Sequence, residues 1–504
     1  MTASIVVEDR PTPGTPRPYE FPPFRRERLA NGLTLLIVDL PGRPLVSATL
    51  ILRRGAADEP SLHAGATALA ARALSEGTQR YTAVELVEAA ERLGAGLHAE
   101  AGWDATSAAI DVPASRLEPA LALLEEMVAR PTFPESEVER LRDERLNDLL
   151  QARADPRRRA DEAFADTVYT PSSPYHRPAG GTKETVTGLH PELLREVHEA
   201  GLDPARVTLI VGGELGGLDV PAIADRLFGG WTPSSGARPA GDVPAASAVS
   251  ERFVRVIHRP GSVQTEIRIG HVGVSRQIPD FHALSVMGAI LGGLFNSRLN
   301  MKLREEKGYT YGAHAGWDLR RAAGPFAARA AVNTEVTVPA IVDTLAELRR
   351  IHDEPVTPDE LRSARDFLVG VFPLRFETAG AVVGALAGMV VHDLPDDELA
   401  RYRPAIEAVT IEDVGRSARE RLDLERAAIV LVGDVDAFGA DLEAAGLGEV
   451  VVERDEGPAA PGPLEGVDEE LGPVDDGHAG PTEGAEEPDE GVEDPTEPHA
   501  NDDR

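Results

Sequence analysis

Arg304 and Tyr311 are the two residues of this sequence best suited to bind a peptide carbonyl or a developing oxyanion. They stand seven residues apart in the stretch 292–312, GGLFNSRLNMKLREEKGYTYG. A guanidinium and a phenol can both donate hydrogen bonds to one oxygen, and two such donors stabilise negative charge on it. Spacing alone favours a plainer interpretation, in which Arg304 is a surface residue and Tyr311 a half-buried strand residue.

A helix followed by a turn and a strand would place these two side chains near each other. The sequence predicts a loop and then a helix over about 295–307, with three leucines facing inward: Leu294, Leu299 and Leu303. The pair 307–308, a lysine followed by a glycine that tolerates positive φ, is typical of a helix end. A strand is expected to open at Tyr309, which puts Arg304 near the helix end and Tyr311 just across the turn.

The composition limits the classes of protein to which this chain can belong. With 504 residues, 42% hydrophobic and 27% charged, it can bury the cores of several domains. A formal net charge of −34 argues against nucleic acid and an anionic membrane surface as partners. The absence of cysteine excludes a disulfide framework and thiolate metal sites. No secretory signal is recognisable and the longest apolar run, 379–391, is too short to span a bilayer, so a cytoplasmic location is expected.

Strand and helix patterns occur in the same order in the two halves of the chain. In the first half, strands are predicted at 32–38, 45–52 and 207–211, and helices at about 62–76, 83–93, 115–130 and 134–153. In the second half, strands are predicted at 267–272 and 427–435, and helices at about 280–291, 295–307, 335–353 and 357–370. The closing strands of the two halves are about 220 residues apart. We therefore expect an internal duplication of one α+β unit.

Changes in composition divide the chain into five segments. A proline-rich, extended arm is predicted for residues 1–24, and a linker rich in Pro, Ala, Gly and Ser for 233–250. These segments delimit two α+β domains, at 25–232 and 251–447. From 453 to 504 the chain carries 19 acidic residues against two arginines. Such a segment buries too little apolar surface to offset the entropy of ordering it, so a disordered acidic tail is expected.

The stretch around Arg304 resembles the Arg/Tyr motif of the pitrilysin/insulinase family of zinc peptidases, peptidase family M16. That motif has the form S-R-L-x-x-x-L-R-E-x-x-G-x-x-Y, and it is matched here by Ser297, Arg298, Leu299, Leu303, Arg304, Glu305, Gly308 and Tyr311. The resemblance implies that Arg304 and Tyr311 help hold the substrate, far along the chain from any zinc. It also implies two homologous α/β-roll domains of the LuxS/M16 metalloenzyme type. Similar segments extend over roughly residues 25–445.

The zinc-binding motif of the same family is degenerate in this sequence. The family carries H-x-x-E-H on a helix, where two histidines bind zinc and the glutamate is the general base, and a distant glutamate is the third protein ligand. In the matching frame 65–78, GATALAARALSEGT, Ala68 and Arg72 take the histidine positions and Ala71 that of the base. The distant glutamate maps near Asp148, and one carboxylate does not make a tetrahedral zinc site. We therefore expect no metal cofactor in this chain.

Arg72 is expected to be an ordinary surface residue. Arginine does not deprotonate in proteins and cannot become a metal ligand. Glu76, four residues on, would lie on the same helix face, which predicts a surface ion pair worth a few tenths of a kcal/mol. None of the 13 histidines occurs in an HxxEH, HExxH or His-x₃-His arrangement, so a shifted zinc site is not expected either.

The resemblance implies a division of labour between two chains that close around a chamber. One chain supplies zinc and the base, while the other lacks them and supplies the Arg/Tyr pair. The leading hypothesis is therefore a non-catalytic subunit whose Arg304 and Tyr311 complete the site of an HxxEH-bearing zinc peptidase acting on peptides. Gly292 and Gly293 would give an extended peptide a flexible approach.

Two other hypotheses remain open. The chain could be a structural or peptide-binding subunit in which no chemistry takes place, or an autonomous zinc peptidase with ligands that the sequence does not reveal. An intact Arg/Tyr pair argues against the first of these, because a scaffold has no use for it. The degenerate zinc motif argues against the second.

Overall fold

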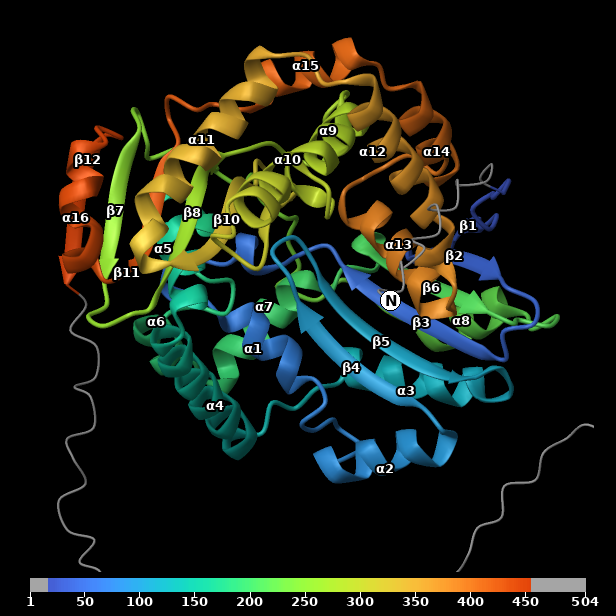
Figure 1. Ribbon diagram of the computed structural model, residues 1–504. Helices are drawn as coiled ribbons and strands as arrows, with labels where there is room; N and C mark the ends of the chain where they lie inside the picture. The colour runs from blue at the N-terminus through green and yellow to red at the C-terminus, as the bar shows by residue number, and fades with distance from the viewer. Residues whose placement is uncertain (1–16, 455–504) are drawn as a thin grey trace, which may run out of the picture. The chain divides into compact units, whose positions relative to one another are not determined.

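Two six-stranded sheets, one in each half of the chain, share the order of five strands and differ in the edge strand, β1 or β12 (Figure 1). This computed structural model describes residues 17–454. The first sheet has the order β1-β2-β6-β3-β5-β4 and the second β12-β7-β11-β8-β10-β9. Its strands are β1 (Arg25–Arg28), β2 (Thr34–Asp39), β3 (Leu45–Leu52), β4 (Gly96–Ala101), β5 (Thr106–Pro113) and β6 (Val207–Gly213) in the first sheet. In the second sheet they are β7 (Phe253–His258), β8 (Gln264–Val272), β9 (Ala313–Trp317), β10 (Pro325–Asn333), β11 (Ala428–Gly433) and β12 (Glu449–Arg454).

The strand pairing confirms the internal duplication. In the first sheet β6 runs parallel to β2 and antiparallel to β3, and in the second β11 runs parallel to β7 and antiparallel to β8. Strands β6 and β11 are the predicted closing strands of the two halves. They hold equivalent places in the two sheets, and both are fully buried. The predicted α+β fold class with two homologous units is correct.

Helices follow the same scheme in each half. The first half contains α1 (Ala66–Ala73), α2 (Ala83–Leu93), α3 (Leu117–Ala129), α4 (Glu135–Ala154), α5 (Pro156–Val168), α6 (Lys183–Thr187), α7 (Pro191–Gly201) and α8 (Val220–Phe228). The second contains α9 (Phe281–Gly288), α10 (Arg298–Asn300), α11 (Thr337–Asp353), α12 (Pro358–Val371), α13 (Ala379–Val391), α14 (Glu398–Ala408), α15 (Ile411–Arg421) and α16 (Val435–Ala444). Local signals set several boundaries, and α2 begins at a capping box formed by Thr82 and Glu85.

Each sheet is covered in part by a helix from the other half of the chain. Helix α5 packs on β11 and β8 of the second sheet, where Phe164 and Val168 join a core cluster with Val430. Helix α13 packs on β3 and β6 of the first sheet. Gly212 of β6 permits that approach, because a Cβ atom there would lie 2.8 Å from a methyl group of Val383. The exchange makes the two halves parts of one folded unit.

The hairpin loop between β9 and β10 fastens the second half to the first. Arg320, near its start, has its guanidinium 4.7 Å from the ring centroid of Trp103 and 4.4 Å from that of Tyr175. Arg320 also pairs with Asp318, and its side chain is only 11% exposed. Arginine between two aromatic faces, withdrawn from water, gives a cation–π contact near the upper end of the usual range.

Two further contacts hold the same loop. The Tyr169 hydroxyl donates a hydrogen bond to the carbonyl of Ala323 at 2.8 Å. Asp104 accepts the backbone N–H of Arg321 at 2.8 Å. Burial raises the pKa of Tyr169, so this hydroxyl stays protonated and remains a donor.

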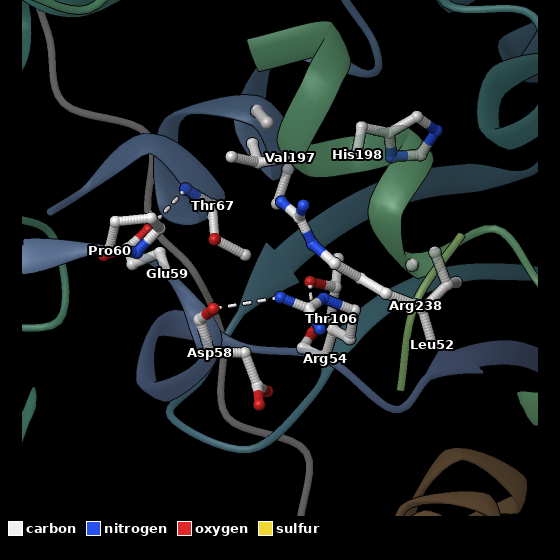
Figure 2. Close-up of a pocket in the computed structure, with 13 residues that line it drawn as sticks. Leu52, Arg54, Asp58, Glu59, Pro60, Thr67, Thr106, Val197, His198 and Arg238 are labelled. Carbon is white, nitrogen blue, oxygen red and sulfur yellow. Dashed lines mark hydrogen bonds between the residues drawn. The ribbon is translucent and has the colours of Figure 1, made fainter. Parts of the chain in front are cut away.

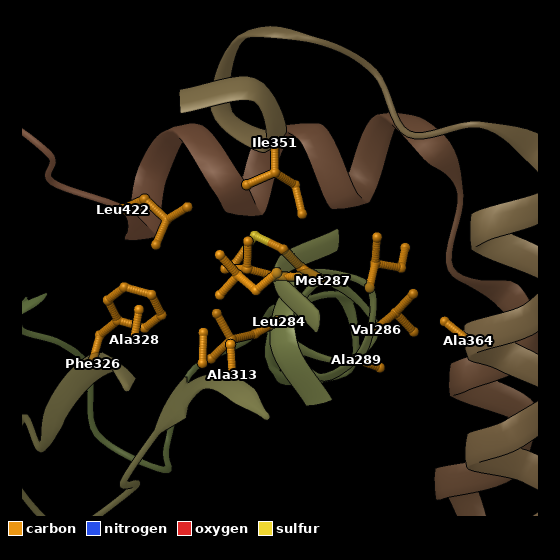
Figure 3. Packing of buried hydrophobic residues seen from close by; sticks show 14 of the residues in the cluster. Leu284, Val286, Met287, Ala289, Ala313, Phe326, Ala328, Ile351, Ala364 and Leu422 are labelled. Atoms are coloured by element: carbon orange, nitrogen blue, oxygen red, sulfur yellow. The ribbon is translucent and has the colours of Figure 1, made fainter. Parts of the chain in front are cut away.

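The second half has its main core around α9. Figure 3 shows Leu284 and Met287 of this helix between Phe326 of β10, Ile351 of α11 and Leu422. All five side chains are at most 5% exposed. This core fixes the helix that leads into the Arg/Tyr motif.

Strand β12 extends to Arg454, so the acidic tail begins later than predicted. The sequence analysis missed this strand and assigned residues from Glu453 onward to the tail, but Glu453 and Arg454 complete β12. The reason is an ion pair, since Glu453 accepts two hydrogen bonds from the half-buried Arg255 at 2.8 and 3.1 Å. The rest of the predicted tail lies outside the described residues.

The predicted N-terminal arm falls partly within the structure. Residues 17–24 form no helix or strand, and Tyr19 and Phe21 pack against Phe376. In the described range 17–454, no single helix is long and apolar enough to cross a bilayer. The segment Pro358–Phe376 and α13 pass that test only together, with a bend of 114° between them.

We predict that Arg320→Ala lowers the free energy of unfolding by roughly 1–3 kcal/mol, because it removes the contact with two aromatic rings and one ion pair. Denaturant unfolding followed by tryptophan fluorescence measures this loss. Arg349→Ala is the matched control, since Arg349 is exposed and forms no ion pair with any residue between 17 and 454. Equal stability of the two variants would contradict the role assigned to Arg320.

Candidate functional site

The residues of the Arg/Tyr motif separate into a buried group and an exposed group. Ser297, Leu299 and Leu303 are each 1% exposed, and Arg298 is 7% exposed. Tyr311 is 91% exposed, and the side chain of Arg304 is 39% exposed. The four buried members therefore build the local fold, whereas Arg304 and Tyr311, like Glu305 and Gly308 of the same motif, are open to solvent.

Arg298 is a structural residue that joins α10 to the start of α12. Its Nε and Nη2 donate hydrogen bonds to the two carboxylate oxygens of Glu360 at 2.7 and 3.0 Å. Glu360 also closes the capping box of α12 by accepting the backbone N–H of Thr357. Burial alone would raise the pKa of Glu360, but these bonds to Arg298 and Thr357 lower it to about 2. The pair is thus ionised throughout the neutral range and holds the motif in place.

The helix that carries Arg304 differs from the one predicted over 295–307. Only Arg298–Asn300 is α-helical, and Met301–Glu306 is a π-helix in which the Lys307 N–H bonds to the carbonyl of Lys302. A second π-helix, Ala289–Gly293, precedes the motif. Short π-helical turns occur frequently at functional sites.

A turn follows the helix at Gly308, as predicted, but the next strand starts later than predicted. Gly308 has φ = +65°, the left-handed conformation expected of it. Strand β9 begins at Ala313 rather than Tyr309, because the Thr310 side chain binds both the N–H and the carbonyl of Gly312 and holds a turn there. Tyr311 therefore lies in this turn, where its side chain projects into solvent instead of packing in a strand.

Phe295 is a neighbour of Arg304 that the sequence analysis did not single out. The Arg304 guanidinium lies 4.8 Å from the centroid of the Phe295 ring, which is 63% exposed. The other contact of Arg304 is an exposed ion pair with Glu305 at 3.4 Å. Buried Asn300 donates to the carbonyl of Phe295 at 2.6 Å, which fixes the loop. In the sequence, the signal that could have identified Phe295 is a large aromatic residue within the stretch 292–312.

Arg304 and Tyr311 are not joined to each other directly. Between 17 and 454, no residue forms a hydrogen bond with the Tyr311 hydroxyl, and no contact connects it to the Arg304 guanidinium. Asn300 links their two segments, because its Oδ1 accepts the N–H of Ala313 at 3.3 Å while its amide holds the loop of Phe295. The Tyr311 hydroxyl and the Nη groups of Arg304 therefore have no hydrogen-bond partner within residues 17–454, while Arg304 Nε pairs with Glu305.

The expectation of a flexible approach at Gly292 is wrong. Gly292 is buried in the first π-helix, and a Cβ atom there would collide with the backbone nitrogen of Ala315 in β9. At Gly293 a Cβ atom would lie 3.2 Å from the carbonyl oxygen of Gly288. Gly292 thus serves the close packing of a helix against an edge strand, and a substrate contact at Gly293 stays a prediction.

The positions of the degenerate zinc motif lie on α1, and Arg72 among them reaches α4. Ala71 is buried, and the side chain of Arg72 is half-exposed. Arg72 pairs with Glu144 of α4 at 2.9 Å, and not with Glu76 as predicted, because Glu76 is bound by Arg140 at 2.8 Å. A guanidinium thus occupies the place of a metal ligand and already neutralises a carboxylate of the neighbouring helix. These residues do not fit a zinc ion.

Asp148, the predicted counterpart of the distant ligand, is also engaged. Arg158 donates a hydrogen bond to it at 2.8 Å, and Arg145 pairs with its other oxygen. The hydrogen bond from Arg158 lowers the pKa of Asp148, with smaller contributions from the charges of both arginines. The carboxylate is ionised but has two cationic partners.

The N-terminus of α1 is a closed cap. Glu59 accepts the backbone N–H groups of Gly65 at 2.7 Å and Thr67 at 2.9 Å. Figure 2 shows the bond to Thr67, with Arg54 and Asp58 beside it. The enclosed cavity here measures about 20 Å³, which is room for about one water molecule. Burial raises the pKa of Glu59, although the hydrogen bonds from Thr67 and Gly65 act to lower it.

One group of possible metal ligands lies elsewhere, at the ends of β7 and β11. His258 has its ring nitrogens 3.7 Å from Asp434 and 3.6 Å from Asp436. His258 Nδ1 accepts the N–H of Val435 at 3.2 Å. At the equivalent place in the first half, Asp39 accepts the N–H of Leu215 at 3.0 Å. The repeat of this bond in both halves indicates a structural role for His258.

Comparison with known families finds two matches along the chain. Residues 34–174 match the family model described as "Insulinase (Peptidase family M16)". Residues 189–368, which contain Arg304 and Tyr311, match the model described as "Peptidase M16 inactive domain". Together the two matches cover β2 to β6 of the first sheet and β7 to β10 of the second, and the boundary between them lies before β6.

Individual proteins give the same result. An uncharacterized zinc protease of Streptomyces coelicolor, SCO5738, is 24% identical over 407 residues, covering 79% of this chain and 87% of that protein. A Helicobacter pylori protein named "Non-peptidase homolog YmxG" is 23% identical over 344 residues, covering 66% of this chain and 76% of that protein. The crystal structure of a peptidase M16 inactive domain from Pseudomonas fluorescens has a TM-score of 0.76 at 24% identity, covering 82% of this chain and 98% of that chain. This likeness confirms the fold.

We predict that removal of divalent metal leaves the folded chain unchanged, because Ala68, Ala71 and Arg72 supply no zinc ligand. Thermal unfolding of the purified protein, before and after dialysis against EDTA, should give the same midpoint, with no stoichiometric zinc by elemental analysis. Stoichiometric zinc together with a lower midpoint in EDTA would show a metal site built from other residues.

Proposed function

Because this chain belongs to the M16, or insulinase, family of peptidases and has lost the residues of the zinc motif, we propose that it is a non-catalytic subunit. It would assemble with a family member that carries an intact HxxEH motif, and that partner would cleave peptides. The contribution of this chain would be Arg304 and Tyr311, presented to the peptide bound at the partner's site.

One observation carries the proposal. Tyr311 is exposed with no hydrogen-bond partner among residues 17–454, and the only ion pair of Arg304 there is an exposed one with Glu305, whereas Arg298 of the same motif is buried and bound to Glu360. An exposed tyrosine without any internal partner contributes nothing measurable to folding, and exposed polar or aromatic residues held on a rigid support are typical of binding surfaces. The scaffold is intact, and what it presents is available to a ligand.

The chemistry of the two side chains suits a peptide backbone. The guanidinium of Arg304 can donate to a carbonyl oxygen and stabilise charge as it develops there. The phenol of Tyr311 can donate a second hydrogen bond to the same peptide unit. In this account the hydrolysis itself, including the activation of water, is the work of the partner's residues alone.

A purely structural or peptide-binding subunit without chemistry is the second candidate. The relative named as a non-peptidase homologue shows that the fold occurs in proteins described as inactive. Loss of Arg304 and Tyr311 would leave the function of such a subunit unchanged, so the two candidates predict opposite results for the same variants.

We predict that Arg304→Ala and Tyr311→Phe in this chain each lower the peptidase activity of the co-purified pair by about tenfold to a hundredfold. The physical reason is the loss of a hydrogen bond that strengthens as charge develops on the substrate oxygen. The measurement is kcat and KM on a fluorogenic peptide, using this chain co-expressed with an HxxEH-bearing relative.

Met301→Ala is the control for these variants, because Met301 is 45% exposed in the same π-helix and has no donor group. It should leave activity within about twofold of the unaltered pair. Full activity of the Arg304 and Tyr311 variants, in pairs that assemble normally, would contradict the proposal and favour the structural subunit.

Phe295 is expected to position Arg304. Phe295→Leu keeps an apolar side chain but removes the aromatic face 4.8 Å from the guanidinium, whereas Phe295→Tyr keeps that face. We predict that Phe295→Leu lowers kcat/KM of the pair by about threefold to tenfold and that Phe295→Tyr restores it. Equal activity of the two variants would show that the ring does not orient Arg304.

A further inference from the structure

We infer that the open cavity between the first sheet and α13 binds a positively charged amine or guanidine group of a peptide, at Asp111 and Ser47. This inference rests on the proposed function for the presence of a peptide. It adds a second place of contact, at residues outside the Arg/Tyr motif, and it specifies the chemistry of the group that binds there.

The cavity measures about 520 Å³ and has walls from both halves of the chain. One wall is the face of β3, β5 and β4 that α13 leaves uncovered, and the other is α13 itself. On the side toward the cavity, α13 presents glycines four residues apart: Gly380, Gly384 and Gly388. The glycines leave room above the opposite polar strands, and Ala387 and Val391 are the other residues of α13 that line the cavity.

Ser47 and Asp111 lie opposite each other on neighbouring strands at one end of this cavity. They are Cα partners in the pairing of β3 with β5. A Cβ atom at Gly380 would lie 3.8 Å from Ser47 Oγ and 3.9 Å from Asp111 Oδ1, so both oxygens converge beside this glycine. Ser47 is only 5% exposed, yet its hydroxyl has no hydrogen-bond partner within the described chain. The unpartnered Ser47 hydroxyl and the exposed carboxylate of Asp111 thus offer two neighbouring oxygens to a hydrogen-bond donor in the cavity.

The charges that face the cavity leave a negative excess. Asp104 is bound by the backbone of Arg321, and Asp318 is paired with Arg320. Burial lowers the pKa of His392, which keeps this imidazole uncharged at neutral pH. Two lining carboxylates, Asp111 and Glu100, have no partner among residues 17–454.

A cationic ligand follows from this distribution. An ionised carboxylate accepts hydrogen bonds and donates none, and the adjacent hydroxyl can also accept, so ammonium or guanidinium is the complementary group. An anionic or apolar ligand would leave Asp111 without compensation. The strand pairing also fixes the separation between Glu100 and Asp111. Ser107, which pairs with Glu100, is four residues from Asp111 on β5, or roughly 13 Å along the strand. An extended peptide of a few residues can therefore contact both carboxylates.

The test uses the full-length chain by itself and three synthetic peptides. The first is N-acetylated and C-amidated with a single lysine among alanine and threonine residues, and the second has norleucine in place of that lysine. The third is the norleucine peptide with a free N-terminus, which separates an N-terminal ammonium from a side-chain one. Isothermal titration calorimetry should show binding of the lysine peptide, at least about tenfold tighter than that of its acetylated norleucine analogue.

Two variants locate the site. Asp111→Asn removes the charge and keeps the shape, and Gly380→Leu fills the space beside both oxygens without changing a charge. Each should weaken binding of the lysine peptide by about tenfold or more. Asp366→Asn is the matched control, because Asp366 is an exposed carboxylate on α12 that pairs with no residue of the described chain. This variant should bind the lysine peptide as tightly as the unaltered protein does.

Each outcome decides the inference. If the free-amine norleucine peptide alone binds, and loses affinity in Asp111→Asn, the site is supported and the ligand is a peptide N-terminus. Equal affinity for all three peptides, absence of binding by all three, or full binding by Asp111→Asn overturns the inference. None of these results depends on Arg304, so a failure here is distinct from a failure of the proposed function, which the activity of the pair decides.

Discussion

The exchange of one helix between the two halves of the chain is the constraint on which the other features depend. Helix α5 completes the core on the second sheet, and α13 lies on the first. Arg320, held between Trp103 and Tyr175, fastens the same interface through a loop. The halves therefore cannot move apart without exposing apolar surface, which costs roughly 25 cal/mol per Å². The polar cavity beneath α13 exists because of this arrangement.

Of the two functional regions of the family, this chain has altered the zinc motif and retained the Arg/Tyr motif. On α1 and α4 an ion pair of Arg72 with Glu144 stands where a metal and its ligands would be, and it satisfies the local charges without any ligand. Around α10, the buried Arg298 keeps its hydrogen bonds to Glu360, and the exposed hydroxyl of Tyr311 has no hydrogen-bond partner among residues 17–454. The first region is closed to chemistry and the second is open to a partner or substrate. The proposed role as a non-catalytic subunit follows from this contrast.

Much of the fold could be predicted from the sequence, because periodicity and turn residues act locally. Strand β3 and helix α2 have the predicted bounds, and the duplication was visible in the two buried closing strands. The partner of Arg72 could not be predicted, because Glu144 lies 72 positions away and reaches it only through packing of α4 on α1. The π-helix at Met301–Glu306 was missed because its hydrophobic spacing is compatible with an ordinary helix. Ser47 and Asp111 carried no motif, and only strand register brings them together.

The central claim is that the exposed residues of the motif touch a peptide held by the zinc-bearing partner. The most direct measurement is photo-crosslinking in the assembled pair, with p-benzoylphenylalanine in place of Tyr311 and the partner's catalytic glutamate replaced so that the peptide persists. The account predicts a crosslink from this position to the labelled peptide, and none from the same probe in place of Phe367, which is 47% exposed on α12. A pair that assembles and binds peptide, but in which the probe at the Tyr311 position never reaches it, would contradict the account.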